Sequence, residues 1–289
     1  MVVDTHTHVW LPPMEDHPWI NPRVMGDVAG YGAGALYGTD DLHADMARVG
    51  VEEAVVVNFA LTDVRDNNAT IQAVENSDDL YGIVTLDEFA DEAPDRLREY
   101  MSVDGVLGVR LGALCPHDRM WMEFDPSVTW LADLADHDPF WDAVQETDAV
   151  VQILVHDSQL DQAVSVVEAH PEVTYLLDHF AMADPSVPPE EAPFARIADL
   201  ADYDVGVKVS EIVHRSEESF PYADVHDHVR WLVETFGRER VIWGSDYPNV
   251  SDQATYTESL RWLDHVETLS DADREWITDR SFRDLVLDG

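Results

Sequence analysis

The sequence predicts a (β/α)8 TIM barrel formed by a single domain that spans residues 1–289. Eight short apolar segments rich in β-branched residues recur along the chain, as expected for strands covered on both faces. Eight segments with helical periodicity alternate with them, which is typical of a barrel of parallel strands. A doubly wound open sheet is the alternative, and it is disfavoured because no glycine-rich phosphate loop follows the first predicted strand.

Each predicted strand is a short run rich in apolar and β-branched residues. In chain order, the predicted strands are residues 2–8, 53–59, 80–86, 106–112, 149–156, 173–180, 205–210 and 240–246. The predicted helices have apolar residues at helical spacing and occupy residues 40–49, 67–76, 93–100, 140–146, 159–169, 194–201, 225–236 and 251–265. The chain beyond residue 269 is expected to add helix that packs on the barrel.

Three long loops follow predicted strands, at residues 10–38, 113–137 and 213–223. Loops that follow the strands of a barrel lie at its C-terminal face, where enzymes of this architecture build their active sites. The sequence therefore predicts a functional site at that face.

The charge of the chain limits its partners. The formal net charge is −42, and Lys208 is the single lysine. A field this negative repels nucleic acid and anionic membranes, so the expected partner is a small-molecule substrate. Acidic residues dispersed along the whole chain are typical of a halophile's protein, which stays hydrated in high salt.

The remaining composition indicates a cytoplasmic protein. Cys115 is the only cysteine, which excludes an internal disulfide and fits a reducing compartment. We find no signal peptide before the first predicted strand and no apolar run as long as a membrane span. Association as a homodimer is expected.

The first predicted strand carries Asp4-Thr5-His6-Thr7-His8. Alternate side chains of a strand share a face, so Asp4, His6 and His8 are expected to point the same way. Neutral imidazole is a common ligand of divalent metals, and two imidazoles side by side offer a two-point chelate.

Polar side chains unsuited to a core also stand near the ends of four other predicted strands. They are Arg110, His156, His179 and Asp246. The carboxyl ends of barrel strands converge on one mouth, so four imidazoles and a carboxylate predict a metal site with a spare acid/base group. Asp157 and Asp178 have the opposite strand parity, and we expect them to face the helix layer or to cap turns.

The order of these residues resembles a known family. Asp-Thr-His-Thr-His-Val-Trp, Leu-Asp-His-Phe, Val-Lys-Val-Ser and Trp-Gly-Ser-Asp-Tyr-Pro are similar to motifs of the amidohydrolase superfamily, in its amidohydrolase-related (amidohydrolase-2) branch. The resemblance covers nearly the whole chain. Members of this branch include lactonases and nonoxidative decarboxylases, so the motifs indicate the branch well and the substrate poorly.

The resemblance implies a role for each matching residue. The implied ligands of one divalent metal ion are His6, His8, His156 and Asp246. His179 is implied to be the unligated acid/base group. Binuclear members carry a lysine on the fourth strand, and this chain has Arg110 there, so a single ion is expected. Three imidazoles and one carboxylate suit zinc, with manganese, cobalt or iron as alternatives.

The predicted function is that of a mononuclear metal-dependent hydrolase acting on a lactone or a related cyclic ester or amide. A bound divalent ion supplies hydroxide near neutral pH, while Asp246 and His179 act as acid/base groups. The same residues also suit a metal-dependent decarboxylase of an unsaturated or aromatic carboxylic acid. A metal-free lactonase that uses the same histidines is the second alternative, and a noncatalytic binding barrel is the third.

Two basic residues bear on the substrate. Arg110 is expected to bind a carboxylate of an anionic substrate through its guanidinium fork, the alternative being a structural ion pair. Lys208 shares parity with Ser210 and is expected to be structural. The alternative for Lys208 is a Schiff-base nucleophile.

Overall fold

The structure is a computed structural model that describes residues 1–10, 37–59, 66–119 and 123–288. Within these residues, eight parallel strands form one sheet in which each strand pairs with the next along the chain. The strands are β1 (Val3–Thr7), β2 (Glu53–Val57), β3 (Leu80–Val84), β4 (Val106–Leu111), β5 (Val150–Ile153), β6 (Tyr175–Leu177), β7 (Val205–Val209) and β8 (Val241–Trp243). The predicted (β/α)8 barrel is confirmed.

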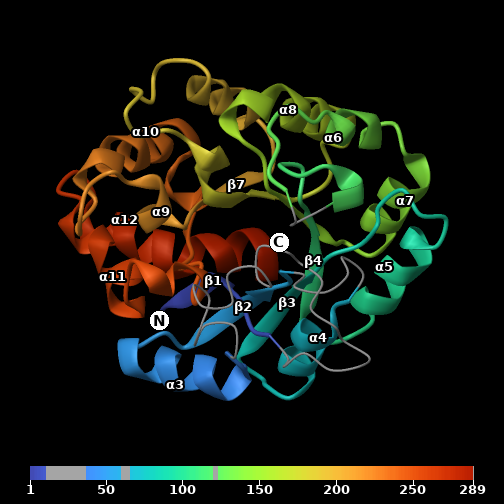
Figure 1. The fold of residues 1–289 in the computed structure, drawn as a ribbon, viewed down its shortest axis with the longest axis horizontal. Coiled ribbons are helices and arrows are strands. Elements are labelled where there is room, and N and C mark those ends of the chain that lie inside the picture. The colour runs from blue at the N-terminus through green and yellow to red at the C-terminus, as the bar shows by residue number, and fades with distance from the viewer. Residues whose placement is uncertain (11–36, 60–65, 120–122, 289) are drawn as a thin grey trace.

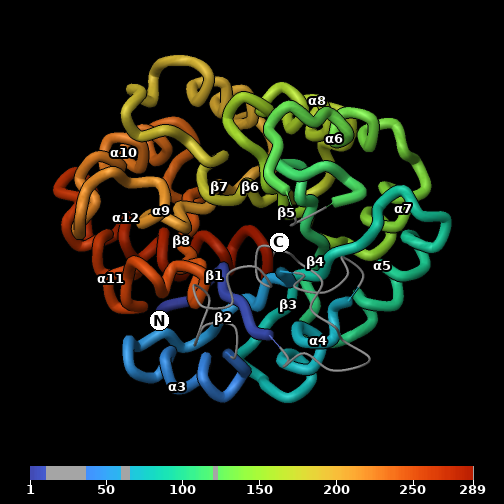
Figure 2. Tube along the Cα trace, in the orientation of Figure 1, coloured from blue at the N-terminus to red at the C-terminus, as the bar shows by residue number. Residues whose placement is uncertain are grey.

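The first and last strands close the barrel, as the tube in Figure 2 shows. Thr7 forms a parallel bridge with Tyr247. The Asp246 N–H donates to the carbonyl of His6 at 2.8 Å, and the His8 N–H donates to the carbonyl of Tyr247 at 2.9 Å. Closure thus binds the segment that carries His6 and His8 directly to the segment that carries Asp246.

Helices surround the strands (Figure 1). In the described residues they are α3 (Thr39–Val49), α4 (Asn68–Glu75), α5 (Ala93–Met101), α6 (Trp130–Leu134), α7 (Asp138–Glu146), α8 (Leu160–Ala169), α9 (Ile212–Arg215), α10 (His226–Phe236), α11 (Tyr256–Arg261) and α12 (Asp271–Glu275). The segment after β6 that was predicted as a helix forms a 3₁₀ helix, Phe194–Leu200. The long helix predicted over residues 251–265 is broken, because Thr255 starts α11 by capping it and accepting from the N–H of Glu258.

Two of the predicted long loops hold structure of their own. α6 lies in the loop after β4, and α9 lies in the loop after β7. Residues 11–36 of the first predicted long loop are outside the described residues. The loops after β4 and β7 follow the carboxyl ends of their strands, which places them at the predicted face.

No helix in the described part of the chain is both long enough and apolar enough to cross a bilayer.

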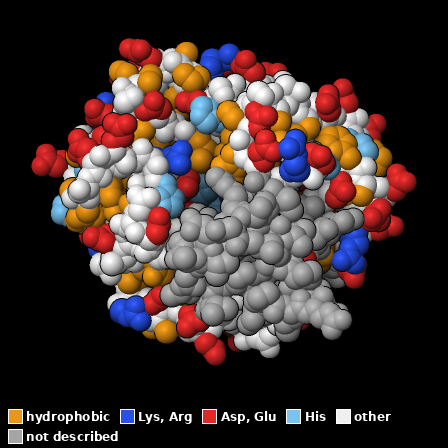
Figure 3. All heavy atoms as spheres, viewed as in Figure 1, with side chains coloured by type: hydrophobic (Ala, Val, Ile, Leu, Met, Phe, Trp, Pro, Cys, Tyr) orange, Lys and Arg blue, Asp and Glu red, His pale blue; other side chains and the backbone are white. Residues whose placement is uncertain are grey.

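Acidic side chains are spread over the described part of the face in Figure 3, with few basic ones among them. With a net charge of −42, repulsion among these acids acts on the compact state wherever salt does not screen it. We therefore expect the melting temperature to rise steadily as NaCl is raised from about 0.05 M to about 3 M, across which the Debye length shrinks severalfold. Scanning calorimetry checks this.

Sucrose at matched osmolality is the control for the salt series, because it strengthens burial without screening charge. A melting temperature that is flat in salt, or that sucrose raises as much as NaCl does, would contradict the screening account.

Candidate active site

The ends of β1 and β8 bring three potential ligands together. Nε2 of His8 lies 3.0 Å from Oδ1 of Asp246, and Nε2 of His6 lies 3.5 Å from the same oxygen. All three side chains are at most 2% exposed. Their ligand atoms lie within 4.8 Å of one another, which is the spacing that a shared cation requires.

His8 and Asp246 border a small pocket at the mouth of the barrel, and His6 lies behind them. The pocket is lined by His8, Phe59, Arg110, Leu154, His179, Met182, Glu211, Asp246 and Asn249. Its volume is about 30 Å³, enough for a water molecule. Among the described residues, this pocket has room for the reacting group of a substrate or a water molecule.

The orientation of His8 is fixed by the neighbouring strand. Its Nδ1–H donates to the carbonyl of Val57 at 2.8 Å, because a carbonyl can only accept. In the neutral ring the lone pair is then on Nε2, which faces the carboxylate of Asp246. Two acceptors that face each other at 3.0 Å need a proton or a metal ion between them. In metal sites, a ligating imidazole commonly donates its other ring N–H to a backbone carbonyl in the same way.

His6 lies deeper, inside the barrel. Its Nε2 is buried and makes no hydrogen bond among the described residues. Its Nδ1 lies 2.9 Å from Nζ of Lys208 and 3.4 Å from Oδ1 of Asp178. Gly244 leaves space for this ring, since a Cβ built there would lie 2.7 Å from Cβ of His6. Lys208 as donor favours the tautomer with a proton on Nε2, whereas Asp178 as acceptor favours the tautomer that leaves Nε2 free to ligate.

Asp178 is the centre of a buried ion-pair network, not a residue of the helix layer as its parity predicted. Its Oδ2 accepts from Nε of Arg110 at 2.8 Å and from Nε2 of Gln152 at 2.8 Å, and Nζ of Lys208 lies 3.5 Å from Oδ1. Burial alone would raise the pKa of Asp178, but the charges of Arg110, Lys208 and His6 hold it well below its usual range. The prediction failed because β6 ends at Leu177, so strand parity does not extend to Asp178.

Lys208 is entirely buried, and its ammonium donates to the carbonyl of Thr5 at 2.7 Å. Burial lowers the pKa of Lys208 to about 8. Its contacts with Thr5, His6 and Gln152 agree with the structural role predicted for it. Arg110 borders the pocket and also makes the ion pair with Asp178, so both roles considered for it have a basis in the geometry.

His179 follows β6 in a turn whose residues 179–182 all have positive φ, which non-glycine residues rarely adopt. This turn directs the imidazole into the pocket, where Nδ1 lies 2.9 Å from Oγ of Ser210 and Nε2 lies 3.4 Å from Nη2 of Arg110. The His179 and His6 rings are 4.7 Å apart. Burial lowers the pKa of His179, so the ring is neutral and can accept a proton.

Asp246 also has a positive φ, of 62°, just after β8. Oδ2 accepts from the side-chain amide of Asn249 at 2.7 Å. Burial would raise the pKa of Asp246, but the neighbouring imidazoles of His8, His179 and His6 hold it below its usual range. The carboxylate is therefore ionised at neutral pH.

His156 is not brought into this group. β5 ends at Ile153, and three residues later the chain turns into a short 3₁₀ helix over Asp157–Gln159, which His156 caps. Nδ1 of His156 lies 2.9 Å from Oδ1 of Asp157 and 2.9 Å from Oγ of Ser158, and its side chain is 39% exposed. The structure thus places three of the four predicted ligands together, and the fourth lies apart because the strand is shorter than predicted.

Sequence reasoning missed Glu211, which lines the pocket just after β7. Its Oε1 accepts from Nδ1 of His214 at 3.1 Å. The sequence offered a weak signal, because Glu211 follows Ser210 directly in the segment that resembles the family. A carboxylate in a strand-end loop is otherwise indistinguishable from the many surface acids of this chain.

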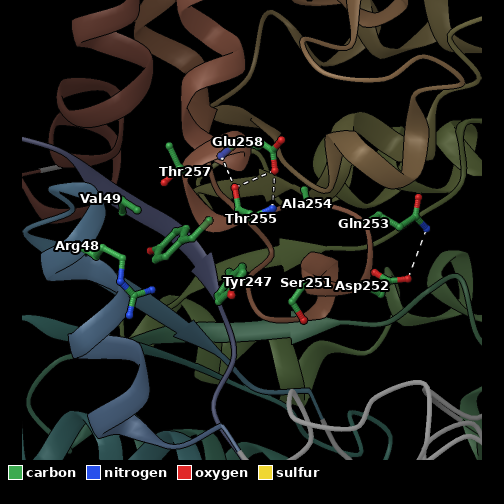
Figure 4. A pocket seen from close by; sticks show the side chains of 11 residues that line it. Arg48, Val49, Tyr247, Ser251, Asp252, Gln253, Ala254, Thr255, Thr257 and Glu258 are labelled. Carbon is green, nitrogen blue, oxygen red and sulfur yellow. Dashed lines mark hydrogen bonds between the residues drawn. The ribbon is translucent and has the colours of Figure 1, made fainter.

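A larger cavity of about 520 Å³ lies between α3 and α11, where Arg48 and Val49 face the segment from Tyr247 to Glu258 (Figure 4). Thr255 and Glu258 line this cavity and hydrogen-bond to each other, as a capping pair at the start of α11. It holds none of the clustered histidines, so the smaller pocket is the candidate active site.

Comparisons with known proteins agree with this geometry. L-fucono-1,5-lactonase of Burkholderia ambifaria is 24% identical over 274 residues, covering 93% of this chain and 88% of that protein. D-galactarolactone isomerase of Agrobacterium fabrum is 25% identical over 289 residues, covering 99% and 87%. 4-Sulfomuconolactone hydrolase of Hydrogenophaga intermedia is 28% identical over 213 residues, covering 71% and 63%.

Solved structures share the fold. A zinc-bound amidohydrolase from Burkholderia multivorans has a TM-score of 0.78 at 21% identity, covering 99% of this chain and 98% of that one. The 5-carboxyvanillate decarboxylase of Sphingomonas paucimobilis has a TM-score of 0.67 at 10% identity, covering 99% and 98%. The amidohydrolase family model matches residues 3–279. The chain therefore belongs to the amidohydrolase family and is an enzyme of the superfamily that contains these lactonases and decarboxylases.

Proposed function

We propose that the protein hydrolyses the ring ester of a lactone, with a water molecule as the nucleophile. The observation that carries this proposal is the convergence of His6, His8 and Asp246 on one buried point, next to the neutral imidazole of His179. The relatives that act on lactones support the same reaction class.

The three converging side chains suit one divalent ion, with zinc as the ion expected for two imidazoles and a carboxylate. His6 and His8 would hold it through Nε2 and Asp246 through Oδ1, since these atoms face one another without a donor between His8 and Asp246. When bound, such an ion lowers the pKa of water and polarises a carbonyl.

The acid/base work falls to Asp246 and His179. The ionised carboxylate of Asp246 accepts the proton of the attacking water as its oxygen bonds to the lactone carbon. The ring C–O bond then breaks, and the proton passes by way of His179 to the departing alkoxide. Ser210 at Nδ1 and Arg110 at Nε2 keep the His179 ring in place. The products are one hydroxyl and one carboxylic acid, which releases its proton to solvent as it becomes a carboxylate, and both residues return to their starting states.

A metal-free lactonase is the second candidate, and the contact between Lys208 and His6 favours it. When the ammonium donates to Nδ1 of His6, the proton on the ring is on Nε2, which lies 3.5 Å from Oδ1 of Asp246. That N–H would polarise the lactone carbonyl as a neutral hydrogen-bond donor. Elemental analysis separates the two candidates.

For the metal-dependent candidate we expect about one equivalent of metal per chain in protein purified in high salt without added metal, as measured by elemental mass spectrometry. His6→Ala should lose most of it, because it removes one of three ligands, whereas His170→Ala, which removes a histidine outside the site, should retain it. Metal in neither wild type nor variants, together with lactone hydrolysis, would select the metal-free candidate. Absence of hydrolysis across a lactone panel, with and without added zinc, would sink the proposed reaction.

A further inference from the structure

Asp4 is a buried carboxylate that the proposed reaction does not use. Its Oδ1 accepts from the backbone N–H of Ser245 at 2.8 Å and from the backbone N–H of His6 at 3.1 Å. Its Oδ2 accepts from the phenol of Tyr256, on α11, at 2.7 Å. The residue is entirely buried, and these three hydrogen bonds satisfy it, as burial of a polar group requires. One side chain therefore links β1, the end of β8 and the helix layer.

The position of Asp4 differs from the one that alternation along the first strand predicted. Its carboxylate reaches α11, whereas the ring of His6 lies inside the barrel beside Lys208. The pairing of β1 with β2 shifts register between Asp4 and Thr7, and such irregularities re-aim side chains next to active sites. Among the described residues, Asp4 belongs to none of the clusters that could hold a metal ion. It therefore lies behind the ligands, as a support for them.

The two amides that Asp4 holds belong to a closed ring of contacts. The N–H of Asp246 donates to the carbonyl of His6 at 2.8 Å, and Oγ of Ser245 donates to the same carbonyl at 3.3 Å. The ring runs from Oδ1 of Asp4 through His6 to Asp246, and back through the peptide of Ser245 to the same oxygen. His6 and Asp246 are the residues whose side chains approach to 3.5 Å at the ligand cluster. Asp4 thus holds the main chain at the points from which both ligands extend.

We propose that Asp4 is a positioning residue that sets the spacing between His6 and Asp246 and so preorganises them for a divalent ion. The proposal rests on the metal-dependent reaction proposed above. Ligands that are held in place before the ion arrives lose less freedom when they bind it. Removal of a group that supports metal ligands from behind typically costs about 10–100-fold in metal affinity. Asp4 acts through the place of its acceptor oxygen, and its negative charge is not required.

Two substitutions of Asp4 separate the acceptor from the charge. Asp4→Leu has a similar volume and no acceptor, so the amides of His6 and Ser245 lose the oxygen that they share. Asp4→Asn is neutral, but its carbonyl oxygen can still accept from both amides. Its side-chain NH₂ can donate to the phenol oxygen of Tyr256, because a hydroxyl also accepts. A positioning role predicts that Asp4→Asn restores what Asp4→Leu loses.

The test is a titration of the chelator-treated protein with Co²⁺ in high salt, followed by visible absorption. Cobalt held by imidazoles and a carboxylate absorbs far more strongly than hydrated cobalt on surface acids, so the signal reports the cluster. We expect the Kd to rise by about 10–100-fold in Asp4→Leu and to stay close to the wild-type value in Asp4→Asn. Glu88→Leu is the matched control, because it removes another entirely buried carboxylate, hydrogen-bonded to His117 and outside the pocket. Its Kd should equal that of the wild type, and circular dichroism shows that each variant is folded.

A folded Asp4→Leu that binds cobalt as tightly as the wild type overturns the proposal, and so does an Asp4→Asn that binds as weakly as Asp4→Leu. If Asp4→Leu fails to fold, Asp4→Glu replaces it, because it keeps the charge and moves the acceptor by one methylene. Asp4→Glu should then bind cobalt less tightly than Asp4→Asn, and the reverse order would overturn the positioning role.

The same titration separates this proposal from the proposed reaction. A wild type that shows no cobalt absorption overturns the role of Asp4 together with the metal-dependent candidate, and lactone hydrolysis by that protein would assign the reaction to the metal-free candidate. A wild type that binds cobalt, with the expected order of variants, but hydrolyses no lactone refutes the proposed reaction and leaves the role of Asp4 in place.

Discussion

Asp246→Asn should lower kcat for lactone hydrolysis by roughly 10²–10⁴-fold, the range over which a positioned acid/base group contributes. The amide cannot take the proton of the attacking water, and it is a poorer partner for the cation expected between His8 and Asp246. The backbone should stay intact, because asparagine tolerates the positive φ of 62° better than most residues. Steady-state kinetics on the best lactone of a panel measures the effect.

The control for Asp246→Asn is Asp271→Asn, which makes the same chemical change at a fully exposed aspartate. Circular dichroism shows whether each variant is folded. A folded Asp246→Asn enzyme with kcat within threefold of the wild type would remove Asp246 from the mechanism. A fall in kcat with little change in KM would indicate a loss confined to the transition state.

Asp178→Ala should destabilise the protein by roughly 3–5 kcal/mol, as expected when one partner of a buried ion pair is removed. The change would leave Arg110 and Lys208 with uncompensated charge in the barrel interior, where both side chains are at most 2% exposed. Urea denaturation at neutral pH and high salt measures the free energy of unfolding. The control is Glu234→Ala, which breaks an exposed ion pair with Arg230 and should cost less than about 1 kcal/mol.

The pH dependence of this stabilisation has a defined sign. The pKa of Asp178 is lower in the folded protein than its ordinary value of 3.8, so its contribution is complete above that value and is lost as pH falls through the folded pKa. The difference between wild type and Asp178→Ala should therefore be constant near neutral pH and shrink only in strong acid. A difference below about 1 kcal/mol at neutral pH would show that the barrel accommodates the two cations without Asp178.

Much of this architecture could be predicted from the sequence, because continuous runs of β-branched residues are typical of parallel strands that are buried on both faces. Alternation along the first strand correctly placed His6 and His8 in one cluster, although the pairing of β1 with β2 shifts register between Asp4 and Thr7 and His8 follows the last residue of β1. The same reasoning failed for His156 and Asp178, which lie beyond the last residues of β5 and β6. Strand parity is a property of regular extended backbone, and it does not carry past the residue at which a strand ends.

The positions of Glu211 and of the buried ion pairs were harder to predict, for a related reason. Glu211 takes its direction from a single left-handed residue in a loop, and no periodic pattern encodes such a conformation. The ion-pair network depends on the partners that β4, β5, β6 and β7 bring to the axis, which are distant in sequence. Sequence patterns locate the ends of strands, whereas the roles of the charged groups there follow from three-dimensional neighbours.

The bridge between Thr7 and Tyr247 has a consequence for synthesis on the ribosome. His6 and Asp246 are separated by most of the chain, so a nascent polypeptide cannot assemble the cluster until β8 has emerged. Until then β1 is an open edge whose unpaired backbone groups can recruit another strand. Because the barrel closes late, the incomplete nascent chain is the form most prone to aggregate. It also means that a chain truncated before β8 carries both histidines of β1 and none of the activity.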